Sequence, residues 1–510
     1  MSQSAGDDAH DGRSGSSRGS GGPWKTLAKA SQITYRAGDR LLLKCGDIWT
    51  DGLELKGGGT ADAPVTVASY GTGRRPVIDR QDSTMAALKR GIHLNGNGSG
   101  WKIANLEIAN AARGIEASLA GPAPAFVWFE NLDIHGCKFG KRFDQNSGDQ
   151  NNMQTGLRIS GSVAGGKATI RSCTFRDNFV GVLSAVSSDI KDCLFEHMEW
   201  TGLWYVAAEG GIIRGNKFMH NCDQYVWCGV SASALGGVRN CVVEYNEFGE
   251  TQVVDGAVDG EDLDFEAGCR NVTMRYNLFH DSAGPASMLY NGAGHDQPNF
   301  GLAIHDNVFL HAAANPSAKH YNCTFLLSDG NTGAITRNRI YPRSGVRVYA
   351  GSKCPGVTRT GNTTVAIEDE PRGDNQSSVA GASASSNGEN AAKVKDNDAA
   401  TCWTGKGASG EWVQLDFRDK KTLDEFIVEQ APGSSIDRFV LQHWDGAAWK
   451  DLFTSYGPMG PCRYLPTWPV STSRVRLFIE STKTGLPSIS ELKAFHTQGP
   501  VSRPARDLSN

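Results

Sequence analysis

Ile213-Arg-Gly-Asn216-Lys-Phe218 is one copy of a short unit in which an asparagine stands between two apolar positions. The unit recurs seven times, with cysteine in place of asparagine in two copies, and its marker residues are Cys173, Cys193, Asn216, Asn246, Asn277, Asn307 and Asn338. These markers are 20, 23, 30, 31, 30 and 31 residues apart. Spacing this regular predicts a repeat architecture in which each unit stacks on the next.

Each copy alternates apolar and polar residues over three to five positions, the pattern of a short β-strand with one buried face. A second short strand often begins at a glycine, as at Gly114, Gly156, Gly181 and Gly202. Together these features predict an all-β solenoid with one coil per unit. Asparagine at a corner tolerates left-handed backbone, and it can hydrogen-bond the same residue one coil along.

Residues 23–368 resemble the right-handed parallel β-helix of the pectin-lyase-like superfamily. The opening stretch agrees, because Gly22-Pro-Trp24, Ala37-Gly-Asp39 and Ala63-Pro-Val65 are similar to the amino-terminal cap and first coils of secreted polysaccharide-degrading members. The resemblance implies this fold and a secreted, periplasmic or cell-surface protein. It leaves the activity open, because the same scaffold carries lyases, hydrolases, epimerases, transferases and phage tailspikes.

A second domain is expected over residues 379–496. The stretch from Asp396 to Trp403, the pair Glu411-Trp412, and the later Trp444 and Trp449 resemble a discoidin domain (the coagulation-factor C-type fold), a β-sandwich that binds sugars in secreted carbohydrate-active proteins. The resemblance implies a structural Ca²⁺, and its ligands would be Asp396, Asp398, Thr401 and Glu491. Hard oxygen ligands on a short loop suit Ca²⁺. The alternative is that these acids only cap turns.

The remaining segments carry little to bury. Residues 1–22 are rich in Gly, Ser and Asp, contain no signal-peptide pattern, and are expected to form a disordered tail. Residues 369–378 are expected to be a linker, and residues 497–510 a second tail. The balance of 51 Lys and Arg against 55 Asp and Glu gives a charge of −4, which argues against nucleic-acid binding. No apolar run is long enough for a transmembrane helix. The oligomeric state stays open.

The candidate catalytic residues lie in one strand. Leu263 and Phe265 have the inward parity, so that alternation predicts Asp262, Asp264 and Glu266 together on the outer face. Carboxylates on one strand face are roughly 6.5–7 Å apart, within the range that suits an inverting glycosidase. Crowded carboxylates raise one another's pKa, which keeps one of them protonated as the acid.

Residues near these acids are expected to bind substrate. Aromatic rings beside carboxylates hold sugar rings through C–H contacts and a few directed hydrogen bonds. The expected substrate-binding residues are Trp204, Tyr205, Trp227, Tyr290, Arg270, Asp259 and Glu261. None of the Asn-Thr-Asp, Gly-His-Gly or Arg-Ile-Lys motifs of polygalacturonases occurs, nor does the Trp-x-Asp-His signature of the main pectate-lyase group. The catalytic roles therefore depend on the strand pattern alone.

Three functions remain in competition. The favoured one is a glycoside hydrolase or transferring relative that acts on a polysaccharide. The second is a Ca²⁺-dependent polysaccharide lyase, in which a basic residue abstracts the C5 proton of a uronate. The density of acids before Arg270 would repel a polyanionic substrate, which favours a neutral glycan. The third is a non-catalytic glycan-binding protein, which the crowded carboxylates oppose because holding them close costs stability.

Overall fold

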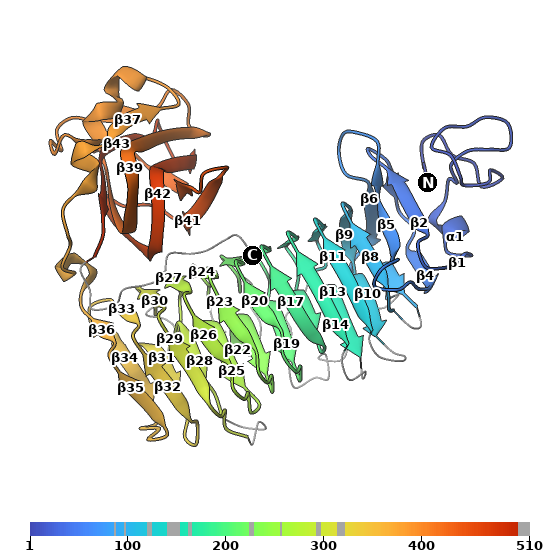
Figure 1. Ribbon diagram of the computed structural model, residues 1–510, viewed down its shortest axis with the longest axis horizontal. Helices are drawn as coiled ribbons and strands as arrows, with labels where there is room; N and C mark the ends of the chain where they lie inside the picture. Colours follow the sequence, from blue (N-terminus) through green and yellow to red (C-terminus); the bar gives the residue numbers. More distant parts are fainter. Residues whose placement is uncertain are drawn as a thin grey trace.

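A computed structural model of the chain shows a long β-helix that carries a β-sandwich at its carboxyl-terminal end (Figure 1). The structure describes residues 1–85, 88–95, 98–119, 125–139, 153–161, 166–223, 229–254, 258–291, 297–313 and 322–497, with backbone only at residues 229, 230 and 258. Both domains consist of strands, as the sequence predicted, and the only described α-helix is the four-residue α1 (Leu27–Ala30).

Three parallel sheets of twelve strands form the β-helix, and each coil gives one strand to each sheet. The first sheet contains β1 (Thr34–Tyr35), β4 (Leu53–Gly57), β7 (Arg90–Leu94), β10 (Arg113–Leu119), β13 (Thr155–Gly161), β16 (Val180–Ser184), β19 (Thr201–Val206), β22 (Gly229–Gly236), β25 (Val258–Glu266), β28 (Ser287–Leu289), β31 (Cys323–Leu327) and β34 (Arg347–Gly351). The second contains β2 (Arg40–Lys44), β5 (Val65–Tyr70), β8 (Trp101–Ala104), β11 (Phe126–Glu130), β14 (Lys167–Arg171), β17 (Ser187–Lys191), β20 (Ile212–Arg214), β23 (Val242–Glu244), β26 (Thr273–Arg275), β29 (Leu302–His305), β32 (Gly333–Thr336) and β35 (Val357–Thr360). The third contains β3 (Ile48–Trp49), β6 (Val77–Asp82), β9 (Glu107–Ala111), β12 (Asp133–His135), β15 (Thr174–Arg176), β18 (Leu194–Glu196), β21 (Lys217–Met219), β24 (Glu247–Gly249), β27 (Leu278–His280), β30 (Val308–Leu310), β33 (Arg339–Tyr341) and β36 (Thr363–Thr364).

The repeat unit spans the corner between the second and third sheets. Each marker asparagine from Asn216 onward donates from Nδ2 to Oδ1 of the next marker at 2.9–3.0 Å, in the order Asn216, Asn246, Asn277, Asn307, Asn338 and Asn362. This ladder confirms the predicted hydrogen bond between coils. The left-handed residue is the one before the marker, such as Tyr245 (φ 55°) or Asp306 (φ 57°), rather than the asparagine itself.

Phenylalanines of the same unit stack inside the helix. Their rings lie parallel along the coils, with centroids 4.6–5.0 Å apart through Phe175, Phe195, Phe218, Phe248, Phe279 and Phe309. All of them are buried, as are Cys173 and Cys193, which behave as small apolar residues at the corner. This column fixes the register of the coils, because a slip of one residue would turn each ring outward.

Residues 1–22 are packed against the first coils, although the sequence predicted a disordered tail. Ser2 is fully buried, and its hydroxyl donates to Asp47 at 2.9 Å. The indole nitrogen of Trp24 donates to the carbonyl of His10 at 2.8 Å. Asp8 accepts hydrogen bonds from the backbone of Lys25 and from the hydroxyl of Thr26. Apart from Met1, which is buried in the core of the β-helix, the segment is held by polar contacts, which the low apolar content did not reveal.

The carboxyl-terminal domain is an antiparallel β-sandwich. Its strands are β37 (Gly381–Ala384), β38 (Trp403–Thr404), β39 (Glu411–Gln430), β40 (Ile436–Trp444), β41 (Trp449–Ser455), β42 (Cys462–Thr482) and β43 (Ser488–Phe495), and the short 3₁₀ helices are η4 (Ile367–Asp369), η5 (Gln376–Val379) and η6 (Gly388–Lys395). The hydrogen-bonded order is β38-β43-β39-β42-β40-β41, with β37 beside β39. Trp403 lies in its core and is fully buried.

The sandwich is docked on the third sheet of the β-helix. Apolar residues of β27, β30 and β33 join the core of the sandwich: Leu278, Val308, Leu310 and Tyr341. Glu247 of β24 accepts hydrogen bonds from the backbone and, at 3.0 Å, from the hydroxyl of Thr454. Asp281 pairs with Arg463. Within the expected linker, Arg372 pairs with Glu425 at 2.6 Å. These contacts fasten the two domains into one unit.

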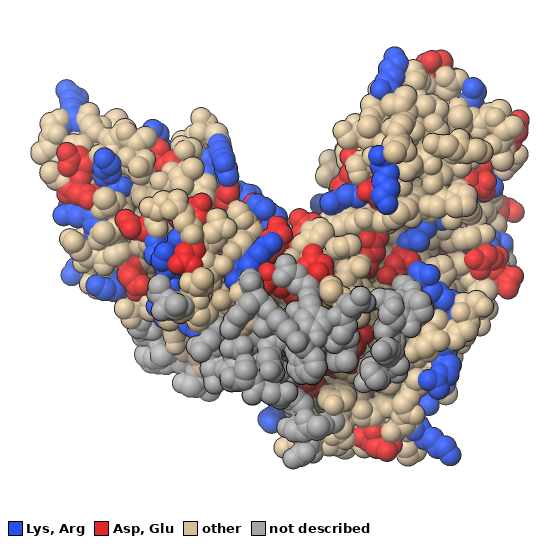
Figure 2. Space-filling model, turned by 180° about the vertical axis from the view of Figure 1, so that it is seen from behind, with Lys and Arg blue, Asp and Glu red and all other residues tan. Residues whose placement is uncertain are grey.

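The docked sandwich and the amino-terminal end both rise from the β-helix, and a wide groove separates them in the space-filling view (Figure 2). Within the described part of the chain, every helix is too short or too polar to span a membrane.

Candidate active site on the first sheet

The predicted acidic strand is β25, at the corner where the chain passes from the third sheet to the first. Asp259 (φ 78°) and Gly260 (φ 72°) are left-handed, and the register with β22 shifts between Val230 and Ser231. Strict alternation therefore starts only at Leu263. Leu263 and Phe265 point into the core as predicted, and both are fully buried.

Asp262 does not share the outer face, which corrects the sequence prediction. It aligns with a row that is glycine or alanine in earlier coils: Gly114, Gly156, Gly181, Gly202 and Ala232. A Cβ at Gly202 would meet Phe195 and Phe218, so this row faces inward at the corner. The Asp262 carboxylate is fully buried and accepts hydrogen bonds from Thr251, at 2.5 Å, and from Ser282. Burial raises its pKa to about 7.

The outer face of β25 instead carries Asp264 and Glu266, joined by Asp259 and Glu261. Glu261 aligns with Val180, Thr201 and Ser231 in earlier coils, a row outside the core. Burial raises the pKa of Glu261 well above its usual range, and the charges of Asp259, Asp264 and Glu266 raise it further. Asp259 and Glu261, which were expected to bind substrate, thus lie beside the candidate catalytic acids. We define the carboxylate cluster as Asp259, Glu261, Asp264 and Glu266.

Burial dominates the electrostatics of this cluster. Desolvation, followed by the charges of Glu266 and Asp259, raises the pKa of Asp264 well above its usual range. Burial and Glu266 raise the pKa of Asp259 to about 6. One oxygen each of Glu261 and Asp264 is buried with no hydrogen-bond partner among the described residues. Burial and mutual repulsion therefore favour the protonated form of these carboxyls over the ionised form.

Aromatic residues flank the cluster along the sheet. Trp204 stands two coils before Asp264 in the same outward row, with the small Ala234 between them. Coils are ~4.8 Å apart, so the indole lies roughly 10 Å along the sheet from the carboxyl. Tyr290 follows β28 at the position opposite Glu266, and its backbone nitrogen donates to Phe265 at 2.8 Å. Both rings are half-buried, as a sugar platform requires.

Two other expected substrate contacts, Tyr205 and Arg270, fall elsewhere. Tyr205 points into the core, is fully buried, and donates its hydroxyl to the carbonyl of Gly210 at 2.7 Å, so it is structural. Arg270 is exposed at the next corner, where its backbone pairs with Arg239 and Phe300, and none of the described interactions joins it to the cluster. Trp227 lies outside the described residues.

A charged network that sequence reasoning missed lies on the same face, several coils earlier. Glu116 pairs with Arg90 and Arg113, and it stands beside His93 and Arg158 in the outward row. No local motif announces these residues. Only the register of the coils, read from Ile92, Ile115 and Leu157, places them together.

The loop that was expected to bind metal lies after η6 in the sandwich. Asp396 accepts hydrogen bonds from the backbone of Asp398 at 2.9 Å and from the Thr401 hydroxyl at 2.7 Å. Glu491 faces this loop. Both of its carboxylate oxygens are buried without a hydrogen-bond partner among the described residues, and burial and Asp396 raise its pKa. Among the residues that the structure describes, no three His, Cys, Asp or Glu side chains are arranged to hold a metal ion.

Comparisons with known proteins agree with this architecture. Residues 90–309 match the family model of the right handed beta helix region, and residues 376–492 match that of the F5/8 type C domain. The chain is thus a right-handed parallel β-helix followed by a discoidin-type domain, which confirms both resemblances. Two crystal structures of GH136 lacto-N-biosidase from Eubacterium ramulus, the native protein and its selenomethionine derivative, each share 18% identity with a TM-score of 0.55, covering 72% of this chain and 67% of that one. No curated protein sequence matches the chain.

Proposed function

We propose that this protein is a glycoside hydrolase that cleaves a polysaccharide or oligosaccharide at the carboxylate cluster of β25. The observation that carries the proposal is the pair Asp264 and Glu266, two carboxyls on one strand face with flanking aromatic rings. The similar crystal structure described above is that of a GH136 lacto-N-biosidase. At 18% identity it supports the scaffold, so the proposal names the reaction class and leaves the sugar open.

Asp264 is assigned as the general acid. Burial raises the pKa of Asp264 and so favours the protonated carboxyl, whose proton would pass to the glycosidic oxygen as the bond to the anomeric carbon breaks. Glu266 is assigned as the second carboxylate, which stabilises the positive charge at the anomeric carbon and either activates water or attacks directly. Trp204 and Tyr290 would hold sugar rings on either side of the cleaved bond.

A substrate series with different leaving groups tests these roles. Asp264→Asn should lower kcat/KM on natural glycosides by roughly 10²–10⁴-fold, yet much less on aryl glycosides whose leaving group needs no proton. Glu266→Gln should lose activity equally on both. Asp262→Asn is the matched control, and it should keep near-wild-type turnover because Asp262 faces the corner.

Two products distinguish hydrolysis from the lyase reaction. We expect new reducing ends from a polysaccharide panel without absorbance from unsaturated uronates, whether or not a calcium chelator is present. Calcium-dependent absorbance would contradict hydrolysis. A chain that binds glycans but yields neither product would show that the protein is a binding protein.

The sandwich is proposed to bind glycan and to hold one Ca²⁺, and the protein to act outside the cytoplasm, secreted or at the cell surface. The unpaired buried oxygens of Glu491 beside Asp396 fit a cation. Asp398 and Thr401 would complete the site with oxygen ligands from the same loop. Bound there, Ca²⁺ would fix the loop against β43, with no part in the glycosidic reaction.

A further inference from the structure

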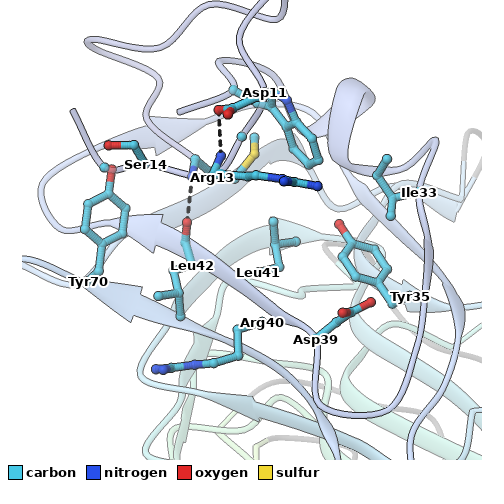
Figure 3. Close-up of a pocket in the computed structure, with 14 residues that line it drawn as sticks. Asp11, Arg13, Ser14, Ile33, Tyr35, Asp39, Arg40, Leu41, Leu42 and Tyr70 are labelled. Carbon is cyan, nitrogen blue, oxygen red and sulfur yellow. Dashed lines mark hydrogen bonds between the residues drawn. The ribbon is translucent and has the colours of Figure 1, made fainter. Parts of the chain in front are cut away.

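A cavity of about 600 Å³ lies at the amino-terminal end of the β-helix (Figure 3). Its floor is Leu41 and Leu42 of β2, and residues 11–15 of the amino-terminal segment form its roof. Eight steps of the first sheet separate β1 beside the cavity from β25, roughly 38 Å at the spacing of parallel strands. We call this cavity the cap pocket.

The roof of the cap pocket lies close against aromatic rings. A Cβ at Gly12 (φ +75°) would stand 2.3 Å from the ring of Trp24, and one at Gly15 would stand 3.0 Å from the ring of Tyr70. Only glycine permits this approach at Gly12, because its backbone is left-handed. The glycines that suggested disorder in the sequence thus shape a wall of the cavity.

The lining combines flat rings with polar groups at close range. Trp24, Tyr35 and Tyr70 supply the rings. Arg13 extends its side chain across the cavity between Asp11 and Leu41, and Tyr70 points toward Ser14 (Figure 3). The Tyr70 hydroxyl is buried with no hydrogen-bond partner among the described residues. Unpaired buried hydroxyls cost stability, so a ligand that supplied the missing bond would be favoured.

This chemistry matches a sugar better than an apolar ligand. Sugar rings present C–H faces to aromatic side chains and a belt of hydroxyls to charged groups, and here Asp11, Asp39 and Arg13 stand at the rings. An apolar ligand would bury these charges at a large cost. The volume falls within the range of small-molecule pockets.

We propose that the cap pocket is a second carbohydrate-binding site, which takes one or two sugar rings of a glycan. The site does not depend on the reaction at β25, because no cluster residue lines it. A short oligosaccharide cannot reach both sites, whereas a polymer or a second glycan chain can. Binding at the cap would raise the affinity for long chains without changing turnover of short ones.

Site-resolved hydrogen exchange of the full chain tests the proposal directly. The probes are cellotriose, chitotriose, tri-galacturonate and β-1,3-galactobiose, each at about ten times a millimolar Kd, where a bound site exchanges about tenfold more slowly. At least one probe should slow exchange of residues 11–15 in the wild type. Peptides from the β-sandwich report binding in that domain separately. The proposed hydrolase is tested by released reducing ends, so a failure at the cap pocket is distinguishable from a failure of the proposed function.

Two variants locate the effect. Leu42→Trp fills the pocket from a half-buried position, and Arg13→Ala removes the cation that crosses it; both should abolish the protection at residues 11–15. Arg18→Ala lies in the same segment outside the pocket and should keep it. No protection with any probe, or equal protection in Leu42→Trp, would overturn the proposal.

Discussion

Asp262 and Asp264 are two residues apart on β25, yet one is turned into the corner between two sheets and the other outward from the first sheet. Asp262 is bound by the hydroxyls of Thr251 and Ser282, whereas Asp264 feels the charges of Glu266 and Asp259. The left-handed residues before them interrupt the alternation. This relationship separates a structural carboxyl from a candidate catalytic one.

The first prediction concerns the role of Asp262 in stability. Below pH 3.8, where Asp262 is protonated in both the folded and the unfolded chain, Asp262→Ala leaves two buried hydroxyls without their acceptor and should lower the free energy of unfolding by about 2 kcal/mol. Asp262→Asn keeps an acceptor oxygen and should lose less. Urea unfolding of both variants measures the difference, and equal losses would show that packing, rather than hydrogen bonding, matters at this position.

The second prediction concerns pH. The pKa of Asp262 is about 7 in the folded protein and 3.8 when unfolded, so the unfolded chain releases this proton first as pH rises. Folding therefore loses stability between pH 3.8 and pH 7, by up to about 4 kcal/mol. Asp262→Asn cannot ionise, and its stability relative to wild type should rise over this window and level off above it. A parallel pH dependence of the two proteins would contradict the buried, ionisable state.

Sequence reasoning located the acidic strand but not its local geometry. The parity of Leu263 and Phe265 placed Asp264 and Glu266 correctly, because strand alternation holds once the strand is regular. It failed at Asp262, since a corner with two left-handed residues shifts the register, and no residue pattern there announced the bend. Tyr205 occupies the same position in its coil as the inward-pointing Phe265 does in β25. Aligning the two coils could have excluded Tyr205 from the substrate-binding residues.

The repeat was easier to predict than the docking of the sandwich. Marker spacing encodes the coils, because each coil must present the same corner. The contacts between the domains join residues about 200 positions apart, such as Glu247 and Thr454, and no periodicity relates them. The amino-terminal segment was missed for a similar reason, since polar contacts such as Ser2 with Asp47 fix it.

The third prediction concerns the sandwich as part of the fold. A chain ending near residue 370 would expose Leu278, Val308, Leu310 and Tyr341. It should unfold at lower temperature and lose activity on short substrates as well as on long ones. Arg463→Ala is the milder test, because it leaves the partly buried Asp281 without this cation. If the truncated chain kept its stability and lost activity only on insoluble substrate, the sandwich would act as an independent binding module.

The fourth prediction concerns calcium. If Ca²⁺ binds between Asp396 and Glu491, saturating metal should stabilise the sandwich by about 2.7 kcal/mol at a hundred times its Kd. A chelator should then lower the Tm of the wild type. Glu491→Gln removes a buried carboxylate whose pKa is already raised, so the variant should be more stable than the metal-free wild type and insensitive to the chelator. Calorimetry of both proteins with and without metal measures this, and a chelator effect that persists in Glu491→Gln would place the ion elsewhere. Reducing ends released from short substrates should change little in either case, because the loop lies in the sandwich and the carboxylate cluster on β25.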